Sequence, residues 1–222
     1  TLILVKKKSP LYVAINGDNV YAASDPIAFE NVKDYYIFEE NEYCMAKNGQ
    51  LDFFTFRGER VAKKTVKFDC AQSSQAITYP HHMLEEIYAT PCALKRLCNA
   101  FESTEYTKKI EAIKNCKFDK IYIVGCGTAY HSGLVGAKYL EKELHVPASC
   151  HIASEFKYNP PIIDKRTLCI FVSQSGETAD TIASMIEAKK KHAKSVAIVN
   201  SAHSTISRMA NITFLIHAGV EI

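Results

Sequence analysis

LCIFVSQSGET, residues 168–178, joins an unbroken apolar run to a loop rich in hydroxyl groups. The apolar run predicts a strand with both faces covered by helices, because a strand with one face in water would alternate apolar and polar residues. Residues 178–191 have helical character, and the apolar stretch at 195–199 predicts the next strand. This alternation of strand and helix predicts a parallel sheet with right-handed crossovers.

The alternation continues on both sides of this unit. The further expected elements are strands at 121–124, 148–152 and 212–216 and helices at 130–144, 154–157 and 205–209. We therefore expect a doubly wound α/β domain over residues 105–222, with ligands bound beyond the carboxyl ends of its strands. Because the sequence stops soon after the last strand without a closing helix, we also expect this domain to be C-terminally truncated.

Residues 1–57 have a different pattern, in which short strands are separated by tight turns. The expected strands are 11–15, 20–23, 35–38, 42–46 and 51–56. Asn48-Gly49 supplies two residues that readily take the positive φ of a hairpin turn. Short strands joined in this way predict an antiparallel meander.

Residues 58–104 are less regular, and we interpret them as a linker between two domains. They include the polar stretch 72–75 and helical character at 83–97, which Pro91 is expected to interrupt. A second helix is expected at 105–114, at the start of the parallel domain.

The composition excludes several classes of protein. Of the 222 residues, 47% are apolar and 23% charged, which is typical of globular domains with a sizeable core. The net charge of +3 comes from scattered Lys and Arg residues, so no nucleic-acid interface is expected. No apolar run approaches the roughly 20 residues needed to cross a membrane. The eight Cys residues form no Cys-x-x-Cys pair, which argues against a zinc site and favours reduced thiols in a cytoplasmic protein.

Two loops occupy the position where an α/β sheet binds its ligand. The first loop, residues 125–128, follows one apolar run, and the second loop, residues 173–178, follows another. Hydroxyl and amide groups in the second loop combine with a glycine that lets the backbone approach a ligand: Ser173, Gln174, Ser175, Gly176 and Thr178. With the N–H groups at the start of the next helix, they can hold a phosphate without Lys or Arg. Glu177 is expected on the first helical turn, with its carboxylate turned away from the anion.

Other interpretations of these residues compete with a ligand site. Ser and Thr before a helix are ordinary N-caps, and for the second loop alone the cap is the simpler explanation. The first loop lacks the third glycine of a dinucleotide site, so no nucleotide cofactor is expected. The pair His81-His82 does not form the His-Glu-x-x-His pattern of a zinc site. No Gly-x-Ser-x-Gly elbow surrounds Ser173 or Ser175, which argues against a serine nucleophile.

Together the two loops resemble a known family. Cys126-Gly127-Thr128 followed by SQSGETADT at 173–181 is similar to the first sugar-isomerase (SIS) domain of the glucosamine-6-phosphate synthases. Further matches to that family, in the family's order, are residues 9–11 and 23–26 (end of the glutaminase domain), 81–91 (linker motif), 153–156 and 218–222. The resemblance therefore spans nearly the whole chain.

The resemblance implies an organisation and a site. It makes residues 1–57 the C-terminal part of a glutaminase (Ntn-type) domain, 58–104 an interdomain linker and 105–222 most of the first SIS domain. It implies that the second loop binds phosphate and that the first loop lines the sugar end of the pocket. The implied substrate-binding residues are Cys126, Gly127, Thr128, Ser173, Gln174, Ser175, Gly176 and Thr178. Ala129 and Glu85 depart from the family pattern, and Ala129 lacks a hydroxyl that members often have.

For the full-length protein the resemblance implies the conversion of fructose 6-phosphate and glutamine to glucosamine 6-phosphate and glutamate. No metal or organic cofactor is implied, and a homo-oligomer is expected. Glutamine is expected to bind only through a missing N-terminal part, and the isomerase acid/base groups lie in a second SIS domain. The isolated segment is therefore expected to contain no catalytic residue. The alternative is a non-catalytic SIS module that binds sugar phosphate and regulates, but the glutaminase-like residues 1–57 argue against it.

Overall fold

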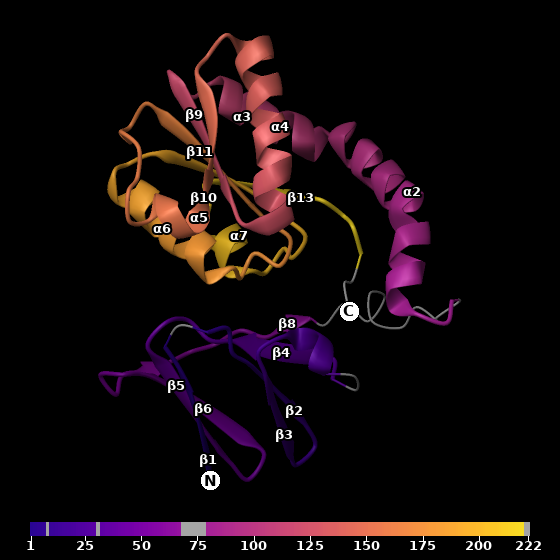
Figure 1. Ribbon diagram of the computed structural model, residues 1–222. Coiled ribbons are helices and arrows are strands. Elements are labelled where there is room, and N and C mark those ends of the chain that lie inside the picture. The colour runs from indigo at the N-terminus through magenta and orange to yellow at the C-terminus, as the bar shows by residue number, and fades with distance from the viewer. Residues whose placement is uncertain (8, 30–31, 68–78, 220–222) are drawn as a thin grey trace. The chain divides into compact units, whose positions relative to one another are not determined.

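The computed structural model describes residues 1–7, 9–29, 32–67 and 79–219. The chain forms two compact units, Thr1–Thr78 and Tyr79–Ile222 (Figure 1). Each unit has hydrophobic cores of its own. Within the described residues, every helix is too short or too polar to cross a membrane.

The second unit is built on a five-stranded parallel sheet. Its strands are β9 (Lys120–Gly125), β10 (Ala148–Ile152), β11 (Thr167–Ser173), β12 (Lys194–Val199) and β13 (Ile212–Leu215). Their order is β10-β9-β11-β12-β13, and every neighbouring pair is parallel. All five strands were expected from the sequence, because each is a short apolar run bounded by turn residues.

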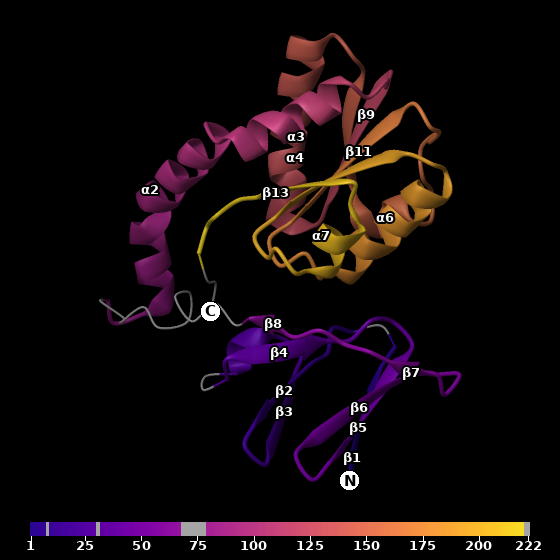
Figure 2. The same cartoon turned by 180° about the vertical axis from the view of Figure 1, so that it is seen from behind.

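Helices cover both faces of this sheet (Figure 2). They are α3 (Thr104–Lys114), α4 (Gly127–Leu144), α5 (Ala153–Phe156), α6 (Ala179–Lys190) and α7 (Thr205–Met209). Within β11, Leu168 packs in a core with Tyr106 of α3 and Ala137 of α4, whereas Phe171 packs in a second core with Met185 of α6. The expected doubly wound α/β fold is confirmed, and burial on both faces explains why β11 is apolar throughout.

Helix α2 (His82–Phe101) differs from the expectation, because it continues through Pro91. A proline in a helix interior removes one backbone hydrogen bond and favours a kink, but helical segments on both sides can hold the two halves together. Helix α3 follows at once, and Ser103 caps it by accepting a hydrogen bond from the N–H of Tyr106 at 3.3 Å.

The first unit contains two four-stranded antiparallel sheets, so the expected antiparallel structure is confirmed, but its strands do not follow one another as a meander. The strands are β1 (Leu2–Lys6), β2 (Tyr12–Asn16), β3 (Asn19–Ala23), β4 (Asp34–Ile37), β5 (Glu42–Lys47), β6 (Gln50–Thr55), β7 (Arg60–Val61) and β8 (Val66–Lys67). They pair in the orders β1-β5-β6-β7 and β3-β2-β4-β8. The chain changes sheet after β4, where Phe38 is fully buried against Val13 and Cys44.

Part of the segment interpreted as a linker belongs to this first unit. Strand β7 pairs with β6 and β8 pairs with β4, so the antiparallel sheets continue past residue 57. The polar stretch 72–75 lies outside the described residues. The expected hairpin is confirmed, since Asn48 and Gly49 join β5 to β6 with φ values of 50° and 70°. The family-based domain boundaries stay a prediction.

Candidate functional site

The strand order creates a topological switch point between β9 and β11. From β9 the chain crosses to β10 on one side and then returns to β11 on the other side. Ligands of open α/β sheets bind at such a point, beyond the carboxyl ends of the strands. The first loop ends β9 and the second loop ends β11, so both predicted loops lie here. The strand ends that carry them lie close together, because a Cβ on Gly125 would lie 3.1 Å from the carbonyl oxygen of Val172 in β11.

The Ser173 side chain bonds to two other residues of the second loop. Ser173 is only 4% exposed. Its Oγ accepts a hydrogen bond from the N–H of Gly176 at 3.1 Å and lies 2.9 Å from Oγ1 of Thr178. Gln174 and Ser175, by contrast, are exposed. The side chains most accessible to a ligand are therefore those of Gln174 and Ser175, while the Ser173 hydroxyl supports the loop.

The two helices that begin at the switch point lack side-chain caps. Cys126 and Thr178 occupy the N-cap positions of α4 and α6, and neither side chain accepts a hydrogen bond from its helix. Ser103 and Ser204 do cap α3 and α7. The second loop is therefore not explained as an ordinary N-cap. The first N–H groups of α6 have no acceptor on Thr178, and they carry the partial positive charge that favours an anion.

The connection between β12 and α7, together with α7 itself, hydrogen-bonds to the backbone of the second loop. The N–H of Asn200 donates to the carbonyl oxygen of Gln174 at 2.9 Å, and the N–H of Ile206 donates to that of Gly176 at 3.0 Å. Gly176 has a φ of 68° and packs so tightly that a Cβ would lie 2.1 Å from Oγ of Ser204. These contacts give the loop a defined shape without a ligand.

Glu177 is turned toward α7 and caps it. Its Oε1 accepts a hydrogen bond from the N–H of Thr205 at 2.7 Å. Glu177 precedes α6, which begins at Ala179, rather than lying on its first turn as the sequence suggested. A carboxylate is stabilised at a helix N-terminus, so the charge of Glu177 is compensated at α7.

We expect Glu177→Ala to lower the free energy of unfolding by about 1–2 kcal/mol, because the N–H of Thr205 loses its acceptor. Glu177→Gln keeps an acceptor at the same place and should lose less than half as much. Urea unfolding followed by circular dichroism measures both variants. Equal losses of unfolding free energy would show that the hydrogen bond from Thr205 to Glu177 does not contribute to stability.

An ion pair lies beside the start of α6. Asp180, in the first turn of α6, accepts a hydrogen bond from Nζ of Lys157 at 2.7 Å. This hydrogen bond raises the pKa of the Lys157 ammonium above its ordinary value. Because the two charges offset each other, Asp180 opposes an anion at the start of α6 less than an unpaired carboxylate would.

The described His, Cys, Asp and Glu residues contain no group of three or more that could hold a metal ion. The described cysteines are free thiols. Cys169 is fully buried in β11, and burial raises its pKa to about 12, so this thiol stays protonated at neutral pH. Cys126 of the first loop is half-buried.

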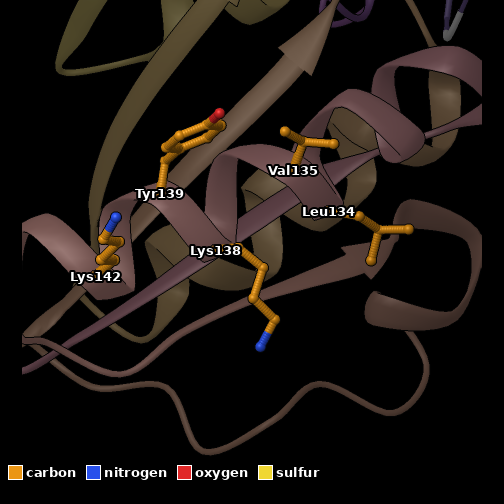
Figure 3. A pocket seen from close by; sticks show the side chains of 5 residues that line it. All are labelled: Leu134, Val135, Lys138, Tyr139 and Lys142. Atoms are coloured by element: carbon orange, nitrogen blue, oxygen red, sulfur yellow. The ribbon is translucent and has the colours of Figure 1, made fainter.

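A separate hollow of about 480 Å³ lies on the outer surface of α4. The residues that line it all project from this one helix: Leu134, Val135, Lys138, Tyr139 and Lys142 (Figure 3). None of the residues predicted for the site is among them. The hollow also lies beyond the first turn of α4, where backbone N–H groups bond within the helix. The candidate site is therefore the switch point and not this hollow.

Comparison with known proteins identifies the parallel domain. The family model described as "SIS domain" matches residues 113–222, which include both loops of the switch point. Residues 113–222 form a SIS domain. A solved structure similar to this chain is the C-terminal domain of glucosamine-fructose-6-phosphate aminotransferase from Francisella tularensis. It is 36% identical with a TM-score of 0.60, and the match covers 67% of this chain and 43% of that chain.

The similarity extends beyond the SIS domain to the whole chain. Glutamine–fructose-6-phosphate aminotransferases (isomerizing) of Clostridium acetobutylicum and Geobacillus kaustophilus are each 38% identical to it, over 229 and 228 residues. Each match covers 100% of this chain and 38% of the relative, so the chain spans about 38% of the length of these curated relatives. These matches confirm the family resemblance inferred from the two loops and their flanking motifs.

Proposed function

We propose that this chain is the sugar-phosphate-binding part of a glutamine–fructose-6-phosphate aminotransferase. The second loop binds the phosphate, and Cys126, Gly127 and Thr128 line the sugar end of the pocket. The observation that carries the proposal is the start of α6, which lacks a side-chain cap and lies beside the exposed Gln174 and Ser175. The position of this loop at the switch point of a SIS domain supports it further.

The proposed chemistry is recognition of a dianion by neutral donors. The Ser175 hydroxyl, the Gln174 amide and the first N–H groups of α6 donate to the phosphate oxygens. We assign Ser173 as the donor in its hydrogen bond to Oγ1 of Thr178, which leaves the Thr178 hydroxyl free to donate to the ligand. Gly176 lets the backbone approach the phosphate.

For the whole protein we propose conversion of fructose 6-phosphate and glutamine to glucosamine 6-phosphate and glutamate. Glutamine binds through a part of the protein outside this chain, and the protein is a cytoplasmic homo-oligomer that binds no nucleic acid. A regulatory SIS module without turnover would bind the same ligand. The relatives match 100% of this chain, including its antiparallel unit, and this favours the enzyme.

Thermal-shift titration with fructose 6-phosphate tests the proposal. A ligand present at 100 times its Kd stabilises the folded state by about 2.7 kcal/mol. At roughly 2–4 °C per kcal/mol, we expect the melting temperature of the wild-type chain to rise by about 5–10 °C. We expect Ser175→Ala to remove at least half of this rise. It should change the melting temperature without ligand little, because Ser175 is exposed and so is the hydrogen bond that its Oγ accepts from the N–H of Glu177.

Two comparisons control this experiment. Ser24→Ala replaces an exposed serine in the first unit and should leave the shift intact. Fructose should give no shift. Glucose 6-phosphate should give a smaller shift than fructose 6-phosphate if the site recognises the sugar as well as the phosphate. A wild-type chain whose melting temperature ignores fructose 6-phosphate would overturn the proposal.

A further inference from the structure

Residues 216–219, which we call the C-terminal strap, leave β13 and run toward α2 (Figure 1). At their start, the N–H of Ile216 donates to the carbonyl oxygen of Val199 at 3.0 Å. Further along, Arg96 of α2 donates from Nε to the carbonyl oxygen of His217 at 3.0 Å and from Nη2 to that of Ala218 at 3.2 Å. Oη of Tyr106 in α3 also lies 3.0 Å from Nε2 of His217. The strap is therefore held by polar contacts from β12, α2 and α3.

The side chain of Asn200 hydrogen-bonds to the last two residues of the strap. Its Oδ1 accepts a hydrogen bond from the N–H of Ala218 at 2.9 Å, and its Nδ2 donates to the carbonyl oxygen of Gly219. The side-chain amide thus binds two consecutive residues of the strap in the way that a neighbouring strand would. These bonds are exposed, so they belong to the part of the domain that opens most readily.

The backbone of the same residue holds the second loop. The N–H of Asn200 donates to the carbonyl oxygen of Gln174 at 2.9 Å. Asn200 follows β12 directly, so its backbone is anchored in the sheet between the loop and the strap. A displacement of the Asn200 backbone therefore acts on the strap and on Gln174 together.

We propose that Asn200 is a positioning residue that couples the C-terminal strap to the second loop. Ligand binding, which fixes Gln174, favours the ordered strap, and an ordered strap favours binding. By linkage the two effects are equal in size. The inference rests on the proposed function, because it takes the second loop as the sugar-phosphate site. It adds a means by which the order of the strap depends on whether that site is occupied.

Hydrogen–deuterium exchange in the wild-type chain tests the coupling directly. The N–H of Ala218 is the reporter, since its acceptor is the side chain of Asn200. Saturating fructose 6-phosphate is expected to slow exchange in residues 216–219 about fivefold or more, which is the lower end of typical coupling between sites. Fructose, which lacks the phosphate, should leave the exchange rate unchanged.

Variants on the two sides of the strap test the route. Asn200→Ala removes the side-chain hydrogen bonds between the strap and the residue that bonds to the second loop. Arg96→Ala removes the hydrogen bonds between the strap and α2 and leaves the second loop unchanged. Each variant is expected to weaken fructose 6-phosphate binding about fivefold in calorimetric titration. The double variant is expected to weaken binding little more than either single variant, because both substitutions act through the same strap. Asn200→Asp keeps the acceptor for Ala218 and should retain part of the affinity. Lys95→Ala, which removes an exposed charge next to Arg96, should bind as wild type does.

The possible outcomes separate the two proposals. If wild type binds fructose 6-phosphate but strap exchange does not change and Arg96→Ala binds as Lys95→Ala does, the coupling is overturned and the binding site stands. If wild type binds no sugar phosphate, the proposed function itself is overturned. Should Asn200→Ala fail to fold, wild-type exchange and Arg96→Ala still decide the matter.

Discussion

Replacing Gly176 by alanine is expected to lower the melting temperature of the parallel domain by about 5–15 °C and to abolish binding of fructose 6-phosphate. With a φ of 68°, Gly176 has a backbone conformation that costs a residue with a Cβ about 1–2 kcal/mol. The new Cβ would also lie 2.1 Å from Oγ and 2.5 Å from Cβ of Ser204. A change of rotamer at Ser204 cannot remove the second contact, so the backbone must move, at about 1–3 kcal/mol.

Gly127→Ala is the matched control for this substitution. Gly127 also has a positive φ, 54°, but a Cβ there would meet no atom within 4 Å. Gly127→Ala should therefore lower the free energy of unfolding only by the cost of the positive φ, about 1–2 kcal/mol. Thermal unfolding by circular dichroism compares the two variants, and equal losses would mean that the packing of Gly176 against Ser204 does not matter.

The parallel sheet was predictable because its signals are local. Each strand is a short apolar run between turn residues, and 148–152 has the same bounds in the sequence interpretation and in the structure. Five strands of the antiparallel unit were predicted too, but its division into two sheets was not, since that depends on which strands pair at long range. Two-residue strands such as β7 and β8 carry no periodic pattern at all.

The candidate site was predictable only in part. The rule that ligands bind beyond the carboxyl ends of strands selected the first and second loops. Applied to the apolar run at 195–199, the same rule could also have selected Asn200, which follows that strand directly. The cap that Glu177 provides for α7 could not be foreseen, because it depends on how α7 packs beside the loop.

Burial is what separates residues of the same type within the second loop. Three of its residues carry hydroxyl groups, and the sequence offers no reason to treat them differently. In the structure Ser173 is 4% exposed and braces the loop, whereas Ser175 is exposed. The two serines therefore call for different tests.

We expect Ser173→Ala to lower both stability and affinity. The N–H of Gly176 is buried with its acceptor, and a buried donor that loses its partner costs about 1–3 kcal/mol. Thr178 loses a contact of 2.9 Å at the same time. The melting temperature should fall by about 2–10 °C. Because the loop also loses its defined shape, affinity for fructose 6-phosphate should fall at least about tenfold, as a loss of about 1.4 kcal/mol would give.

Comparison with Ser175→Ala shows whether Ser173 acts by bracing or by direct contact. Ser175→Ala should weaken binding and change the melting temperature of the free chain little, since both its side chain and the hydrogen bond it accepts from the N–H of Glu177 are exposed. Calorimetric titration and thermal unfolding of both variants give the two quantities independently. If Ser173→Ala unfolds at the wild-type temperature and loses only affinity, then Ser173 acts on the ligand directly. The hydrogen bond from Gly176 would in that case contribute nothing to the shape of the loop.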